Sequence, residues 1–364
     1  MGVWCPVTKV LMLVNWKVRY CDEKPADLQP PDYYVAGEPY WFYRYFKGNW
    51  EVDVLDVHSL PAIERFEKDK LRFYVLQTLR ALPKLGKYDL VVSHGMQSGV
   101  ILSLWRRFFK TRAKHVVFDI GSFASASEEG CALRLMQNAS KSIDGVIYHT
   151  NSQIGYYRKC FPWLENRARF IPFGTDLDFF QADDVEAHDE GAPYFTCIGS
   201  AKRDWDTLVE AYCGLGTDVQ LKIIGHVDPR YAGVPGIEMI PHVPVKVMKS
   251  YIKGALFCAL PLKSFNYSYG QMTLMQQMAM GKCVVAAKAP SLVDYAVDGD
   301  SALFYEPKDV EGCRERLRTV IEEPQVRYAV ARRAPAYLAQ NRNEEIMAAG
   351  IEAFFEEVLR GGVR

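Results

Sequence analysis

The sequence has no excess of either charge, because 44 lysine and arginine residues are matched by 44 aspartate and glutamate residues. A neutral chain gives no general indication of nucleic-acid binding, so any attraction for anions has to come from local clusters. No apolar run approaches the roughly 18 to 20 residues that cross a bilayer, and the amino end lacks the basic start and cleavage region of a signal peptide. We therefore expect neither secretion nor a membrane span.

The nine cysteines include no C-x-x-C pair. An odd, dispersed set is typical of reduced, buried thiols in a cytosolic protein, so we expect a cytoplasmic location. No metal-ligand spacing is evident either. We expect His94 to be a cleft residue and His149 to be packed in a core, and we expect no metal site.

The sequence also lacks internal repeats, low-complexity tracts and a G-x-G-x-x-G motif after any strand. The missing glycine motif argues against a nicotinamide-dependent oxidoreductase, although the pattern of strands and helices would allow one.

The chain is long, and predicted strands and helices alternate along it. Its 364 residues, 49% of them apolar, suffice for two domains with separate cores. In the first half, apolar strands at residues 9–16, 51–57, 88–93, 116–120, 145–149 and 169–172 alternate with helices such as 63–82 and 100–109. After the polar, acidic residues 181–193 the alternation restarts. This pattern predicts two doubly wound, Rossmann-like α/β domains that face each other across a cleft. We place the first at 1–178, a linker at 179–193, the second at 194–340, and a terminal helix, packing back on the first domain, at 341–364.

Residues 255–307 form the most informative stretch. They predict a strand, a polar aromatic loop, a helix ending near Gly281 and a further strand. The helix would begin beside the carboxyl end of the strand, where its first amides and its dipole favour a diphosphate. These amides belong to Gly270, Gln271, Met272 and Thr273. The alternative is an ordinary strand–helix–strand unit whose loop only connects.

Other polar residues follow strands in both halves, and we expect them to line the two walls of the cleft. In the second domain, Gly199, Ser200, Lys202 and Arg203 follow its first strand, and Ser268 and Tyr269 precede the helix. In the first domain the candidates are Lys17, Arg19, His94, Gly95, Asp119, Gly121 and Asn151. Cations and helix amides on one wall, and a carboxylate and an imidazole on the other, suit transfer from a diphosphate leaving group to a hydroxyl acceptor. Lys17 and Arg19 could equally be surface charges.

Two further segments could contact a partner. The aromatic residues 33–46 form either a binding loop or a packed staple. Residues 105–114, from Trp105 to Lys114, combine five cations with three aromatic rings and no acid. They suit an anionic membrane surface, but a helix whose carboxyl end carries cations would look the same.

Several segments in order resemble a known family. RFIPFGTDLDFF, FTCIGSAKRDWDTLVEAY, LKIIG, MKSYIKGALFCALPL, GQMTLMQQMAMGKCVVA and YAVDGDSALFYEP are similar to segments of GT-B-fold glycosyltransferases of the retaining family 4 (glycosyl transferases group 1). The resemblance spans nearly all of residues 169–307, whereas YDLVVSHG in the first half is less specific. It implies the GT-B fold and a metal-independent transfer from a nucleotide-diphosphate sugar, with no bound cofactor.

The resemblance assigns roles to single residues. Arg203 matches the family's phosphate-binding lysine, and Lys202 could replace an arginine that falls on Ser200 here. Gln276 stands at the second glutamate of the E-x7-E motif, which holds the ribose, while the first glutamate has no counterpart near Ser268. Asp119 occupies the place of a catalytic-side histidine.

The implied mechanism retains the anomeric configuration. The acceptor oxygen attacks the face that the nucleotide leaves, and the departing phosphate takes the acceptor proton, so Asp119 and Arg203 are the expected catalytic residues. We expect a glycan or lipid-linked acceptor, no nucleic-acid partner, and peripheral contact with the inner membrane face. The alternative, suggested by Gln276 and the missing glutamate, is a catalytically silent GT-B module that binds a nucleotide or a partner.

Overall fold

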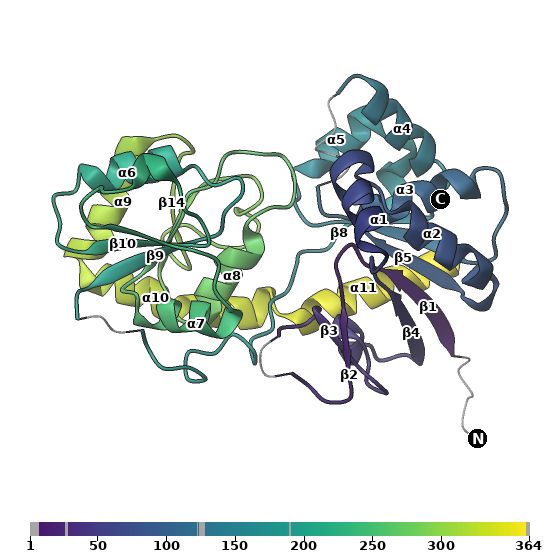
Figure 1. Cartoon of the computed structure of the whole chain (residues 1–364), viewed down its shortest axis with the longest axis horizontal. Coiled ribbons are helices and arrows are strands. Elements are labelled where there is room, and N and C mark those ends of the chain that lie inside the picture. Colours follow the sequence, from purple (N-terminus) through teal and green to yellow (C-terminus); the bar gives the residue numbers. More distant parts are fainter. Residues whose placement is uncertain (1–6, 26–27, 122, 124–127, 189–190, 362–364) are drawn as a thin grey trace. The chain divides into compact units, whose positions relative to one another are not determined.

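The computed structural model describes residues 7–25, 28–121, 123, 128–188 and 191–361. The chain divides into two compact units (Figure 1). The first unit contains residues 1–172, Asn266–Ser268 and Glu345–Arg364. The second contains Phe173–Phe265 and Tyr269–Glu344.

A parallel six-stranded sheet forms the centre of the first unit, in the order β4-β1-β5-β6-β7-β8. The strands are β1 (Thr8–Leu13), β4 (Trp50–Leu55), β5 (Leu90–His94), β6 (Lys114–Asp119), β7 (Gly145–Tyr148) and β8 (Ala168–Phe170). The central strands are buried and mainly apolar, because both faces of a parallel sheet are covered. The register places His94 opposite Phe118 and Asp119 opposite Tyr148.

Helices that connect successive strands cover one face of this sheet. They are α1 (Pro61–Phe66), α2 (Val75–Ala81), α3 (Met96–Arg106), α4 (Cys131–Ser140) and α5 (Gln153–Cys160), with short turns at η2 (Glu67–Leu71), η3 (Leu82–Lys87) and η4 (Pro162–Arg167). The single helix expected over residues 63–82 is wrong. Arg72 adopts a left-handed φ of 59°, which ends the first helical segment before α2 begins.

The helix α11 (Glu344–Leu359) lies on the other face (Figure 1). Its apolar side chains Ile351, Phe354 and Phe355 are buried, and Phe355 packs edge-on against Phe118 of β6. Burying each such side chain contributes about 1.5–3 kcal/mol. Helix α11 therefore contributes to the first unit's core.

The segment between β1 and β4 contains structure that the sequence did not lead us to expect. Strands β2 (Arg19–Cys21) and β3 (Tyr33–Val35) form a small parallel sheet, followed by the turn η1 (Trp41–Tyr45). The rings of Tyr40, Trp41 and Phe42 are buried. The aromatic segment is therefore docked on the first unit.

The second unit repeats the plan, with a parallel sheet in the order β11-β10-β9-β12-β13-β14. The strands are β9 (Tyr194–Ile198), β10 (Gln220–Ile224), β11 (Ile237–Ile240), β12 (Cys258–Leu260), β13 (Val284–Ala287) and β14 (Leu303–Tyr305). The helices are α6 (Trp205–Cys213), α7 (Val245–Gly254), α8 (Gln271–Ala279), α9 (Val310–Glu322) and α10 (Pro324–Asn341), with a short turn η5 (Pro229–Tyr231).

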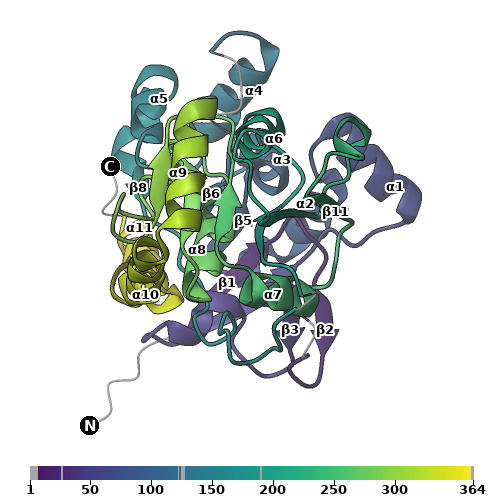
Figure 2. The same ribbon diagram turned by 90° about the vertical axis from the view of Figure 1, so that its left-hand side faces the viewer.

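Within this unit α6 and α9 lie on one side of the sheet and α7 and α8 on the other (Figures 1 and 2). Helix α10 was missed because its periodicity is weak and Pro335 lies inside it, although Pro324 at its first turn is a favourable start.

The expected fold class of two α/β units, each with a doubly wound parallel sheet, is confirmed. Within the described residues, no helix is both long and apolar enough to cross a bilayer. The eight described cysteines are free, as expected, but Cys131 and Cys213 are exposed rather than buried.

Candidate functional site

Three loops at the carboxyl ends of β9, β10 and β12 meet in the second unit. The amide of Gly199 donates to Ile224 O at 2.9 Å, and the amide of Asp204 donates to Pro261 O at 2.9 Å. Gly199 has a φ of 118°, and a Cβ there would lie 2.4 Å from Arg203 Nη2. Glycine is therefore required at residue 199 for the turn that brings the arginine back under the strand end.

Arg203 is the centre of this group. Its side chain is buried, and its Nε and Nη2 donate to Ile198 O at 3.0 and 2.8 Å. The same guanidinium donates to Tyr269 Oη at 2.8 Å and to Thr273 Oγ1 at 3.2 Å. It thus connects the end of β9 with the loop before α8 and with the first turn of α8. These bonds use four of the five guanidinium N–H groups, and the fixed cation suits an anion that accepts from the second N–H of Nη1.

Lys202 and Tyr269 lie beside the arginine. Lys202 is exposed, has a left-handed φ of 59°, and places its Nζ 4.8 Å from the centre of the Tyr269 ring. The Tyr269 hydroxyl also donates to Ala201 O. Two cations of one loop and one ring of another are therefore held together through contacts that the sequence did not indicate. Donor binding by Lys202, Arg203 and Tyr269 stays a prediction.

Helix α8 begins next to this cluster. Gly270 caps it with a φ of 79°, and a Cβ there would lie 2.4 Å from Leu262 Cδ1. The helical ladder supplies no acceptor for the first amides of α8, which are those of Gln271, Met272 and Thr273. Together with the helix dipole, these amides make the amino end attractive to an anion.

The two glutamines of α8 differ in environment. Gln276, expected to contact a ribose, is half-buried. Gln277 is fully buried, and neither its Oε1 nor its Nε2 has a hydrogen-bond partner within the part of the chain that the structure describes. The burial of Gln277 was not expected from the sequence, because a polar residue in a helix is usually assigned to the surface.

Ser268, another expected donor residue, lies in a short stretch that belongs to the first unit. Ser268 is buried, and the neighbouring Asn266 Oδ1 accepts a hydrogen bond from Ser152 Oγ at 2.5 Å. The ring of Tyr267 leaves no room at Gly121, where a Cβ would lie 2.9 Å from Tyr267 Cδ2. The expectation for Ser268 as a donor contact stays a prediction.

In the first unit, the sheet brings together some of the expected acceptor-side residues. His94 ends β5, Asp119 ends the neighbouring β6, and Asn151 follows β7. Gly95, with a φ of 90°, caps α3 directly after His94. These residues share one edge of the sheet because the carboxyl ends of parallel strands lie side by side.

The carboxylate of Asp119 is fully buried and holds the loop after β6. Oδ1 accepts from the amides of Gly121 at 2.9 Å and Phe123 at 3.3 Å, and Oδ2 accepts from Gln153 Nε2 at 2.8 Å and from the Tyr157 hydroxyl. Each hydrogen bond to a charged acceptor stabilises by about 1.5–3 kcal/mol. In this structure the carboxylate orders the loop and α5, while its expected catalytic role stays a prediction.

His94 lies in an aromatic cage. Its ring centre is 4.7 Å from Trp16, 5.8 Å from Trp41 and 5.7 Å from Phe118. The side chain is 7% exposed, and neither ring nitrogen has a hydrogen-bond partner among the described residues. Burial lowers the pKa of His94 to about 3, so the imidazole is neutral at physiological pH.

The remaining expected residues are dispersed. Lys17 forms an ion pair with Glu64 at 2.7 Å, and Arg19 is an exposed residue of β2. His149 is fully buried, as expected for a packed residue, with Nδ1 2.6 Å from Ile171 O. No cluster of three or more potential metal ligands occurs in the described ranges.

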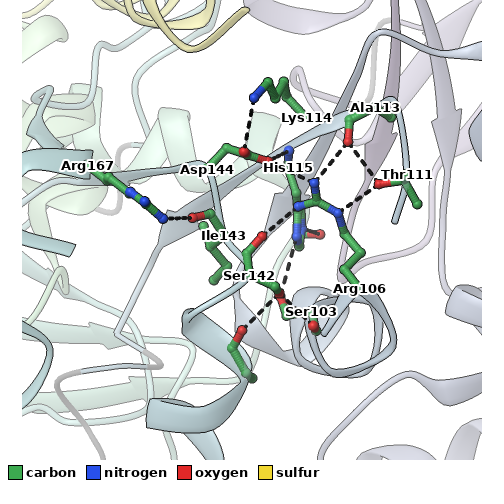
Figure 3. A network of polar contacts seen from close by, with 12 residues as sticks. Ser103, Arg106, Thr111, Ala113, Lys114, His115, Ser142, Ile143, Asp144 and Arg167 are labelled. Carbon is green, nitrogen blue, oxygen red and sulfur yellow. Dashed lines mark hydrogen bonds and ion pairs between the residues drawn. The ribbon is translucent and has the colours of Figure 1, made fainter. Parts of the chain in front are cut away.

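The basic segment after α3 divides into two parts. Arg106 Nη2 donates to Asp144 Oδ2 at 2.9 Å, and other donors of Arg106 reach Thr111 Oγ1, Ala113 O and Ser142 O (Figure 3). Lys114 also pairs with Asp144, and Arg112 pairs with Asp89. These three cations take part in the fold, whereas Arg107 and Lys110 are exposed beside Phe108, 83% exposed, and Phe109, 55% exposed.

Comparisons with known proteins address both units. Residues 192–323 match the model of the family Glycosyl transferases group 1. A search of curated proteins finds no match. Among solved structures, sucrose-phosphate synthase from Thermosynechococcus elongatus has a TM-score of 0.69 at 15% identity, covering 97% of this chain and 100% of that one.

Two further structures are similar over almost the whole chain. Anabaena Alr3699/HepE in complex with UDP-glucose has a TM-score of 0.67 at 13% identity, covering 96% of this chain and 99% of that one. An α,α-trehalose-phosphate synthase (UDP-forming) from Burkholderia xenovorans, in complex with glucose-6-phosphate, has a TM-score of 0.67 at 12% identity, with coverages of 96% and 99%. At such identities the likeness establishes the fold.

Proposed function

We propose that the chain transfers a sugar from a nucleotide-diphosphate sugar to a hydroxyl group with retention of configuration. The premise is that it is a GT-B glycosyltransferase with a glycosyl transferases group 1 domain at residues 192–323. The observation that carries the donor assignment is Arg203, whose buried guanidinium reaches both Tyr269 and Thr273. UDP is the first donor nucleotide to test, because Alr3699/HepE is similar in structure and has been solved with UDP-glucose.

In the proposed ground state the diphosphate lies against Arg203 and the amino end of α8. Lys202 adds a second positive charge on the exposed side. As the bond from the anomeric carbon to the diphosphate oxygen breaks, negative charge grows on that oxygen, and these fixed donors stabilise it. One such donor is worth about 3 kcal/mol in a transition state.

The remaining steps need no side-chain nucleophile. The acceptor oxygen forms the new bond on the face that the nucleotide leaves, and its proton passes to the departing phosphate. Arg203 and the α8 amides already supply positive charge, so we propose that no metal ion is required; a chelator would then leave the rate unchanged. The first unit supplies the acceptor side, where Asp119 fixes the loop after β6 and Asn151 is exposed.

The acceptor is proposed to be a glycan or a lipid-linked molecule, handled at a membrane surface. Phe108 and Phe109 are exposed between Arg107 and Lys110, whose charges are not taken up by the network of Figure 3. Apolar rings flanked by cations suit the interface of an anionic bilayer. The protein would then work in the cytoplasm as a peripheral protein of the inner membrane face.

Donor binding is tested by calorimetric titration of the full chain with UDP and with UDP-glucose. Arg203→Lys keeps the charge but loses the planar fork, so we expect the Kd for UDP to rise about tenfold or more. Arg332→Lys, an exposed residue of α10, is the matched control. Equal affinities of Arg203→Lys and wild type would refute the assignment of the diphosphate site.

Turnover distinguishes an enzyme with this donor from a silent binding module. We expect release of UDP from UDP-glucose in the presence of hydroxyl acceptors, and an NMR spectrum of the product with the anomeric configuration of the donor. If no common nucleotide sugar is hydrolysed or transferred, the proposed reaction is wrong. An inverted product would refute retention alone.

Membrane contact is tested by vesicle sedimentation. We expect wild type to sediment with vesicles containing phosphatidylglycerol and the Phe108→Ser variant to remain in the supernatant. Phe66→Ser changes another exposed ring of the first unit and serves as the control. Equal recovery of wild type with anionic and neutral vesicles would refute the proposed contact with an anionic membrane.

A further inference from the structure

The first unit contains a pocket lined mostly by the aromatic segment at residues 33–46, and none of the expected catalytic, donor-binding or acceptor-side residues line it. Its volume is about 180 Å³, which corresponds to about six water molecules at about 30 Å³ each. It opens in the segment between β1 and β4, at the small β2–β3 sheet and η1. The lining residues are Lys24, Pro30, Tyr33, Tyr34, Val35, Glu38, Pro39, Tyr40, Trp41 and Arg44.

The aromatic lining is held in place by packing and hydrogen bonds. Tyr40 is almost fully buried, and its hydroxyl donates to Pro31 O at 2.7 Å. The half-buried ring of Tyr34 lies 5.8 Å from the Tyr40 ring, with an angle of 38° between the planes. Trp41 packs edge-on against Tyr40 at 6.5 Å. The pocket therefore offers the flat face of Tyr34 on a packed aromatic support that ligand binding need not order.

Trp41 also has an unusual backbone. Its φ is 49°, a left-handed conformation that is a genuine outlier for a bulky residue. Such strain persists only where the surroundings hold the residue, and it is concentrated at ligand sites. The Trp41 ring lines the pocket, and its centre is also 5.8 Å from the centre of the His94 ring. The pocket is thus connected to the carboxyl end of β5.

The charged residues of the pocket select among ligands. Lys24 and Glu38 are exposed, and Arg44 is half-buried, so the lining carries both signs. An acyl chain would desolvate these groups without replacing their hydrogen bonds. A phosphate could pair with Lys24 and Arg44 but has no proton to donate to the carboxylate of Glu38, which it would repel. A neutral ring with hydroxyl groups can donate to the carboxylate, accept from the cations, and place its C–H face on an aromatic ring.

We propose that this aromatic pocket binds a neutral pyranose ring, as a subsite for a sugar unit of the acceptor. The assignment to the acceptor rests on the proposed glycosyltransferase function, whereas the sugar-binding chemistry rests on the pocket alone. Tyr34 supplies the stacking face, with Tyr40 packed behind it, and Glu38 and Arg44 bind hydroxyl groups. The pocket then favours an acceptor that contains at least one neutral sugar.

The proposal is tested by saturation-transfer-difference NMR on the full chain, with the methyl glycosides of glucose, galactose and mannose as probes. We expect saturation transfer to the C–H protons of at least one glycoside. Tyr34→Leu keeps the apolar bulk but removes the flat face, and we expect about tenfold weaker binding. Glu38→Ala should also weaken binding, whereas Glu23→Ala, an exposed acid outside the pocket, should bind like wild type.

Three results would overturn the proposal: no saturation transfer from wild type to any of the glycosides, equal binding by wild type and Tyr34→Leu, or tighter binding of glucose 6-phosphate than of methyl glucoside. Thermal melting of each variant verifies folding, and Tyr34→Phe, which keeps the ring, should restore binding if the face is what matters.

The same preparations are titrated with UDP, so that the two proposals fail separately. UDP binding without glycoside binding would refute the pocket and leave the donor site standing. Glycoside binding without UDP binding would refute the proposed donor and leave the pocket as a sugar site. With an active donor, Tyr34→Leu should raise the KM for a saccharide acceptor without changing the affinity for UDP.

Discussion

Three buried neutral histidines should make the first unit sensitive to mild acid. Burial lowers the pKa values of His94, His115 and His149 to about 3 in the folded chain, from 6.5. The unfolded chain therefore binds more protons than the folded chain between these two values, and stability falls as the pH falls through that window. Above 6.5 the three imidazoles are neutral in both states, and their contribution no longer depends on pH.

The magnitude follows from the size of the window. Lowering the pH from 6.5 to about pH 5 costs about 1.4 kcal/mol per pH unit for each imidazole, which is about 2 kcal/mol per histidine. Three histidines would then cost about 6 kcal/mol, a large share of the roughly 5–15 kcal/mol that stabilises a typical domain. We expect the urea midpoint of the first unit to drop steeply across this range.

The His94→Phe variant isolates one of the three contributions. Phenylalanine suits the cage of Trp16, Trp41 and Phe118, and the imidazole makes no hydrogen bond that would be lost among the described residues. Removing one titrating group should reduce the slope of unfolding free energy against pH by about 1.4 kcal/mol per unit. Other acid-titrating groups are present in both wild type and His94→Phe, so their contributions cancel in the difference between the two slopes.

The assay is urea unfolding, followed by tryptophan fluorescence at several values between about pH 5 and pH 7. His242→Phe, at an exposed position, is the control and should keep the wild-type slope. If His94→Phe has the same slope as wild type, the imidazole of His94 is protonated in the folded chain and the reasoning from burial is refuted.

Three other substitutions give separate predictions. Glu352→Ala removes the buried carboxylate of α11 that accepts from Lys47 N at 2.9 Å and Gly48 N at 2.7 Å. It should lower the unfolding free energy by about 3 kcal/mol. The control Glu356→Ala, at a more exposed position of the same helix, should lower it less. Gln277→Met replaces a buried amide that lacks partners in the described chain and should raise the melting temperature; a drop would show that the amide is satisfied. Tyr269→Phe removes the acceptor of Arg203 Nη1 and should weaken UDP binding about fivefold in calorimetry. An unchanged affinity for UDP would contradict this expectation.

Comparison of the sequence with the structure shows where local patterns were sufficient. The second-unit strands Tyr194–Ile198, Gln220–Ile224 and Val284–Ala287 coincide with apolar runs of the sequence, because buried parallel strands are apolar on both faces. The start of α8 was equally clear, since Gly270 and the following periodic residues are a local capping pattern. Local hydrophobic pattern therefore determined the fold class and the start of the helix at which we propose the diphosphate site.

Contacts between distant residues decided the rest. The aromatic pocket depends on how residues 28–44 pack on the first unit, and α11 contacts that segment through Phe355, whose ring centre is 6.4 Å from that of Tyr43. The same holds for Asp119. Its residue type suggested chemistry, but its carboxylate accepts hydrogen bonds from its own loop and from α5. Only the tertiary structure shows which polar groups are already satisfied, because hydrogen bonds to a buried carboxylate or imidazole depend on packing and leave no periodic trace in the sequence.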